Sequence, residues 1–182
     1  MRPIGYLYKQ VNDQVEWLKA EHVKDVYSLS GHVSANFADY INYWQHNGYW
    51  LFNSPGLIRQ LAAEHSITLS RLKLFYYEAY EREYDADSQE WYDFEPEASF
   101  DTDVVLPASK ILEGFDVVTF SVGTSPECSP LSCNALAQML PTNEHCLFQS
   151  FDLAKSALEE GKFKNGEPGP YRIIAVFSVD DA

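Results

Sequence analysis

The chain has 182 residues, of which 46% are hydrophobic and 15% aromatic, and its formal net charge is −14. This composition is too apolar for a disordered segment, and the length suits one globular domain spanning residues 1–182. A strongly negative surface repels nucleic-acid phosphates and anionic lipids, so we expect neither nucleic acid nor a membrane as a partner.

The sequence favours a cytoplasmic location. No apolar run approaches the roughly 18 residues needed to cross a bilayer, and the N-terminus, which turns polar after residues 1–6, lacks the continuous apolar core of a secretory signal. Three cysteines are an odd number for a secreted disulfide framework. We therefore expect reduced thiols.

The first half of the chain combines one predicted strand with two predicted helices. Residues 4–8 are aromatic and branched, which is typical of a strand. Residues 34–46 repeat apolar side chains at helical spacing before Asn47-Gly48, a pair that commonly ends a helix. Ser54-Pro55 supplies an N-cap and a first-turn proline, which predicts a second helix to about His65.

Residues 71–95 fit two structures. Apolar side chains from Leu72 to Tyr80 match a helical stripe, so a helix over 71–85 stays open. Eight aromatic residues lie between Phe75 and Phe94, however, and the polar residues 85–88 separate them into two runs. This pattern favours two strands joined as a hairpin.

The last third of the chain predicts strands and helices that do not alternate regularly. The predicted elements are a strand at 115–122, a helix at 131–140, a strand at 146–149, a helix from Ser150 to Gly161, and a central strand at 171–179. The two most apolar strands should bury Val118, Phe120, Ile173, Ala175 and Phe177. We expect an α+β domain whose mixed or mostly antiparallel sheet packs against three to four helices.

One loop could carry thiol chemistry. Residues 123–134 are rich in turn-forming residues, and Cys133 would lie in the first turn of the following helix, where the helix dipole favours a thiolate. His145 is the candidate base. The competing interpretation makes Cys133 a small core residue and His145 a surface residue, so no catalytic residue is assigned.

No metal or cofactor is expected. Cys128, Cys133, His145 and Cys146 have the right types for zinc, but four residues separate the first pair and the second pair is adjacent, which together differ from the usual ligand spacing. The sequence has no calcium-binding loop, glycine-rich phosphate loop or nucleophile elbow.

Acidic residues are concentrated in one segment. Residues 72–103 hold 11 acids and two bases, which amounts to −9 of the total charge. We expect the chain to be a protein-binding module or inhibitor that presents this acidic, aromatic-rich surface to a basic partner protein. The candidate binding residues are Tyr80, Glu81, Glu83, Tyr84, Asp85, Trp91 and Asp93.

In size and acidity the chain resembles the immunity proteins that bacteria make against their own nuclease toxins, a resemblance of composition that covers no motif. It implies an inhibitor. Two alternatives stay open, namely a cysteine-dependent enzyme that uses Cys133 and His145, and a structural domain that forms homo-oligomers through exposed aromatic residues. The simplest interpretation of the acidic segment is a solvated surface.

Overall fold

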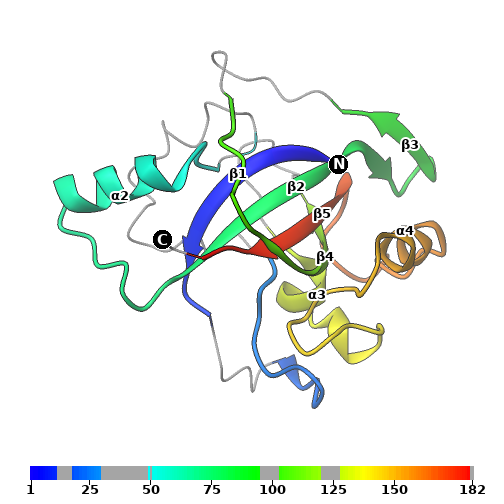
Figure 1. Ribbon diagram of the computed structural model, residues 1–182. Coiled ribbons are helices and arrows are strands. Elements are labelled where there is room, and N and C mark those ends of the chain that lie inside the picture. The colour runs from blue at the N-terminus through cyan, green and yellow to red at the C-terminus, as the bar shows by residue number, and fades with distance from the viewer. Residues whose placement is uncertain (12–17, 30–48, 50, 95–102, 120–127, 181–182) are drawn as a thin grey trace.

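A five-stranded antiparallel sheet organises the computed structural model of the protein (Figure 1). The structure describes residues 1–11, 18–29, 49, 51–94, 103–119 and 128–180. The strands are β1 (Arg2–Lys9), β2 (Lys73–Asp85), β3 (Glu90–Asp93), β4 (Ile111–Thr119) and β5 (Tyr171–Ser178). Their order is β1-β2-β5-β4. β1 pairs with residues 73–79 of β2, and β3 pairs with residues 82–85 of the same strand. The predicted α+β class with an antiparallel sheet is confirmed.

The strand interpretation of residues 71–95 is confirmed. β2 and β3 form a hairpin in which Tyr84 pairs with Trp91. At the turn, Oδ1 of Asp85 accepts hydrogen bonds from the backbone amides of Asp87 at 2.8 Å and Ser88 at 3.4 Å. A short polar side chain that bonds its own backbone in this way stabilises a turn, which explains why the polar residues interrupt the aromatic run.

The last strand is central, as predicted. β5 lies between β2 and β4, and all eight of its residues are buried. Val118, Ile173, Ala175 and Phe177 are buried as expected, and Phe120 lies outside the described residues. The apolar run at the end of the chain therefore forms the middle of the sheet.

Two helices begin where their caps predict. In α2 (Pro55–Glu64) the Ser54 hydroxyl accepts a hydrogen bond from the backbone amide of Leu57. In α4 (Phe151–Glu159) the Ser150 hydroxyl plays the same part for the amide of Leu153. Figure 1 shows α2 beside β1, and α3 and α4 on the side of β4 and β5.

The predicted helix over 131–140 is wrong as one element. The structure has a single turn, α3 (Pro130–Cys133), followed by a 3-10 helix, η4 (Leu136–Gln138). Ala135 separates them because its φ of 55° lies in the left-handed region. The expected strand at 146–149 is reduced to isolated bridges made by Phe148.

The helix count is tested only in part. The predicted helix at 34–46 lies outside the described residues, and the described residues contain three α-helices, α2, α3 and α4. Within the same residues, no helix has the length and apolar character needed to cross a membrane.

A buried carboxylate joins distant segments. Asp116 in β4 is fully buried, and its Oδ2 accepts a hydrogen bond from the backbone amide of Leu29 at 2.7 Å. Its Oδ1 accepts one from the Ser129 hydroxyl at 2.5 Å. Nearby, the buried ammonium of Lys9 donates to the carbonyl of Ser28. Burial raises the pKa of Asp116 to about 6 and lowers the pKa of Lys9 to about 8, while each charge favours the other.

Removing this carboxylate should destabilise the protein strongly. We expect Asp116→Ala to lower the free energy of unfolding by about 3–5 kcal/mol, because it removes the charge that favours the buried Lys9 ammonium and leaves three donors, the amides of Leu29 and Val117 and the Ser129 hydroxyl, without their acceptor. Urea denaturation of Asp116→Ala, Lys9→Met and the double variant tests this. The double variant should lose less than the sum of the single losses; strict additivity would show that the two charges are not coupled.

Candidate functional site

The seven predicted binding residues all lie on the β2–β3 hairpin. Tyr80, Glu81, Glu83, Tyr84 and Asp85 belong to β2, and Trp91 and Asp93 belong to β3. The hairpin therefore brings together residues that the sequence grouped only by composition. The aromatic and the acidic side chains of the hairpin have different surroundings.

The three aromatic residues among the predicted binding residues pack inward. Tyr84 is only 3% exposed, and its ring lies 5.1 Å from that of Trp91. Tyr80 packs edge-on against Trp91 and against Phe151 of α4. The Trp91 indole donates a hydrogen bond to Glu159 at 2.9 Å. The ring of Tyr84 is thus buried in the apolar cluster under α4, and its role in binding stays a prediction.

Several carboxylates of the hairpin have local partners. Oε2 of Glu83 lies 2.9 Å from the guanidinium of Arg172, and Asp93 forms an exposed ion pair with Arg82 across the two strands. Asp85 holds the turn. Glu81 is exposed on the outer surface of the hairpin.

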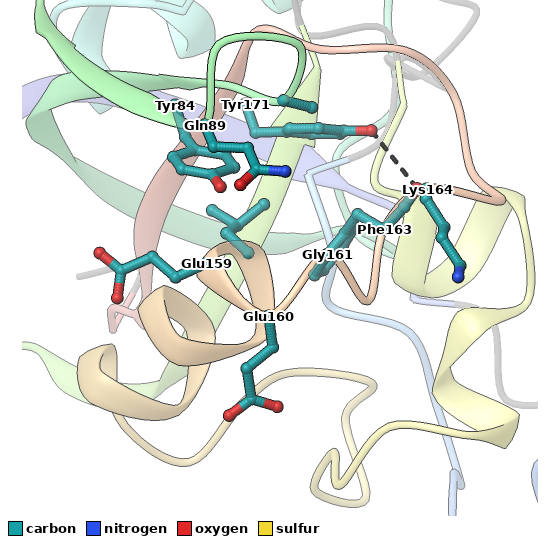
Figure 2. A pocket seen from close by; sticks show the side chains of 10 residues that line it. Tyr84, Gln89, Glu159, Glu160, Gly161, Phe163, Lys164 and Tyr171 are labelled. Carbon is teal, nitrogen blue, oxygen red and sulfur yellow. Dashed lines mark hydrogen bonds between the residues drawn. The ribbon is translucent and has the colours of Figure 1, made fainter.

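Two adjoining pockets lie against the hairpin. The inner pocket, of about 380 Å³, is drawn in Figure 2 and is lined by Tyr84, Ala86, Gln89, Leu158, Glu159, Glu160, Gly161, Phe163, Lys164 and Tyr171. The outer pocket, of about 540 Å³, is lined by Glu83, Asp85, Ala86, Asp87, Tyr92, Lys164, Gly166, Pro168, Gly169, Pro170 and Tyr171. They share Ala86, Lys164 and Tyr171.

Sequence reasoning missed one wall of these pockets. The glycine- and proline-rich residues 166–170 look like a simple turn in the sequence. In the structure, Asn134 Oδ1 accepts a hydrogen bond from the amide of Glu167 at 2.8 Å, and the Tyr171 hydroxyl donates to the Glu167 carbonyl at 2.6 Å. These contacts fix the loop opposite the hairpin, and the only sequence signal for it was the repeated proline.

Cys133 is an exposed thiol beside a second, buried thiol. It is the fourth residue of α3, and Cys128 directly precedes the N-cap Ser129, positions whose side chains meet across a helix start. The hydrogen bond between the two thiols lowers the pKa of Cys133 to about 7 and, together with burial, raises that of Cys128. Cys133 therefore has substantial thiolate character at neutral pH.

His145 has other partners. Its ring stacks on Tyr27 with centroids 4.1 Å apart, and its Nδ1 contacts Asp25. Its Nε2 lies 3.8 Å from a carboxylate oxygen of Glu113. Within the described residues no hydrogen bond joins His145 to Cys133, so the structure does not assemble them as a nucleophile and base.

Metal-ligating residues do not gather in the described ranges, where no group of three or more histidine, cysteine or acidic side chains is arranged to hold a metal ion. Comparisons with known proteins add no relative, since no family model, curated protein or solved structure matches the chain. The functional argument therefore depends on the geometry of the hairpin and its pockets.

The low pKa of Cys133 predicts selective alkylation. Iodoacetamide should modify Cys133 with a rate that inflects near pH 7, while the buried Cys128 and Cys146 react slowly. Cys128→Ala removes the hydrogen-bond donor and should move the inflection toward the ordinary thiol value of about 8.5. Mass spectrometry over a series of pH values measures the alkylation rate of Cys133 in wild type and in Cys128→Ala, and Cys146→Ala is the control. An unchanged inflection in Cys128→Ala would refute the role of the thiol pair.

Proposed function

We propose that the protein is a protein-binding module or inhibitor whose β2–β3 hairpin receives a basic partner protein. The lining of the two adjoining pockets supports this proposal most directly. It contains the carboxylates Glu83, Asp85, Asp87, Glu159 and Glu160 and a single basic residue, Lys164. A concave surface with this charge balance attracts cationic groups.

The surface of the hairpin extends this negative field. Residues 81–93 contain six acids and one arginine. Glu81, Asp87, Glu90 and Asp93 are exposed, so their charges act on the surrounding solvent. Fields of this kind speed the encounter with a partner of opposite charge.

The hairpin also offers apolar contact area. Tyr92 is 45% exposed and lines the outer pocket beside the prolines of the opposite loop. Tyrosine supplies a large contact area at a low cost in conformational entropy, and it is common where proteins meet. The acidic surface thus combines long-range attraction with a place for close packing, as an inhibitor of a basic protein requires.

The three cysteines are free, which suits the cytoplasmic location that we propose for this protein.

A second candidate function is self-association. Val105, Leu106, Ile111 and Leu112 are each at least 47% exposed near the start of β4, a strand at the edge of the sheet. Light scattering would support it if wild type were dimeric and Ile111→Lys monomeric.

Charge reversal on the hairpin should slow association. A partner is first identified by carbodiimide cross-linking, which joins carboxylates to the lysines of a bound protein, and is then purified for surface plasmon resonance. Glu81→Lys combined with Asp87→Lys should lower the association rate about tenfold at low salt. Raising the salt from 0.1 to 1 M should have a similar effect, because the Debye length falls from about 10 to about 3 Å.

The matched control is Glu21→Lys combined with Glu64→Lys, which makes the same charge change at exposed positions that do not belong to the hairpin. Its association rate should fall much less. Equal effects of the two double variants, or a rate indifferent to salt, would contradict the proposal.

A further inference from the structure

The inner pocket is lined by a tyrosine whose hydroxyl has no hydrogen-bond partner among the described residues. Tyr84 as a whole is only 3% exposed, but its hydroxyl is not among the fully enclosed side-chain atoms of the described residues, so it opens into the pocket. Figure 2 shows this hydroxyl directed toward α4, in the space lined by Gln89, Gly161 and Phe163. A hydroxyl that opens into a pocket and is not used by the described residues can donate to, or accept from, a group that enters the pocket.

The other tyrosine of the pocket differs. The Tyr171 hydroxyl donates to the Glu167 carbonyl at 2.6 Å, so it is already occupied in holding the loop. Its ring, together with Phe163 and Leu158, forms an apolar wall. The carboxamide of Gln89, an exposed residue of the hairpin turn, stands at the edge of the same space (Figure 2). The pocket therefore offers apolar walls with one phenol and one amide.

The surroundings of the pocket favour a cation. The C-terminal end of α4, which carries the negative end of the helix dipole, forms its floor at Glu159 and Glu160. In Figure 2 these two carboxylates extend outward, so they lie at the rim. The only base of the lining, Lys164, directs its ammonium group away from the Tyr84 hydroxyl.

We propose that the inner pocket receives an arginine side chain of the basic partner, with the guanidinium donating a hydrogen bond to the Tyr84 hydroxyl. This inference rests on the proposed function and names the group that the site recognises. The aliphatic part of arginine packs on Leu158 and Phe163, and the guanidinium plane faces the Tyr171 ring. Arginine suits these walls better than lysine because its guanidinium is planar and more weakly hydrated.

The closing experiment uses defined peptides and needs no partner protein. Acetyl-Gly-Arg-Gly-amide is titrated into the isotopically labelled full chain, and the backbone amide signals of Gln89, Gly161 and Lys164 are followed by NMR. The matched probe replaces arginine with citrulline, which keeps the shape and removes the charge. We expect the arginine peptide to shift these signals and to bind at least about tenfold more tightly than the citrulline peptide.

Tyr84→Phe isolates the hydroxyl, because it keeps the ring that packs under α4. It should weaken binding of the arginine peptide about fivefold, the effect of one hydrogen bond. Tyr80→Phe is the control, since Tyr80 lies on the same strand and lines neither pocket. Equal binding of the arginine and citrulline peptides, or equal affinities for Tyr84→Phe and wild type, would overturn the proposal.

These outcomes separate the pocket from the wider function. If the arginine peptide binds as expected but charge reversal leaves partner association unchanged, the arginine site stands and the proposed steering by the hairpin fails. If association depends on charge and salt but the arginine peptide shifts none of the three signals, the module stands and the arginine site is refuted.

Discussion

The buried carboxylate of Asp116 connects the sheet to the walls of the candidate site. It accepts a hydrogen bond from the hydroxyl of Ser129, the N-cap residue of α3, and this hydroxyl makes no cap hydrogen bond to the helix. A single helical turn is not stable alone, so tertiary contacts hold α3 in place. Asn134, just after α3, then accepts the amide of Glu167 in the loop that faces the hairpin. A charge in the core thus positions a pocket wall at the surface.

Close packing continues this connection. A side chain on Gly166 would approach Pro130 of α3 to 3.0 Å and the Asn134 side chain to 3.1 Å. The absence of a side chain at this position therefore allows the loop to lie directly on α3. The glycine is explained by this contact, which joins segments more than 30 residues apart, and less by the turn that the local sequence suggests.

Local patterns in the sequence predict much of the fold. Ser54 and Ser150 begin α2 and α4, and the uninterrupted apolar run of β5 makes it central. The break at Ala135 has no local signal, because alanine favours continuation of the helix and only the surrounding structure places it in a left-handed conformation. The role of Asp116 depends on Leu29, 87 residues away. The only sequence signal for this role was an acidic residue within an otherwise apolar strand.

The candidate site was also predictable only where it depends on residues that are close in the sequence. Composition located the acidic, aromatic hairpin, since its residues are neighbours in the chain. Composition did not show which aromatic side chains face inward. Tyr84 packs against Trp91 and Tyr92 is exposed, and this difference follows from the position of α4. The pockets join the hairpin to residues 158–171, a pairing that exists only in the folded chain.

The arrangement of charges separates two tasks in binding. Exposed ion pairs such as that between Arg82 and Asp93 contribute little to stability, so the concentration of acids on the hairpin is not explained by folding. Exposed carboxylates act at long range and govern the rate of encounter, whereas a desolvated contact governs how long a complex lasts. The hairpin supplies the exposed carboxylates for long-range attraction. The hydroxyl of Tyr84, which has no partner among the described residues, lies in the pocket and can make the desolvated contact. Because the two features occupy one hairpin, a cation drawn in by the carboxylates arrives beside the pocket that can hold it.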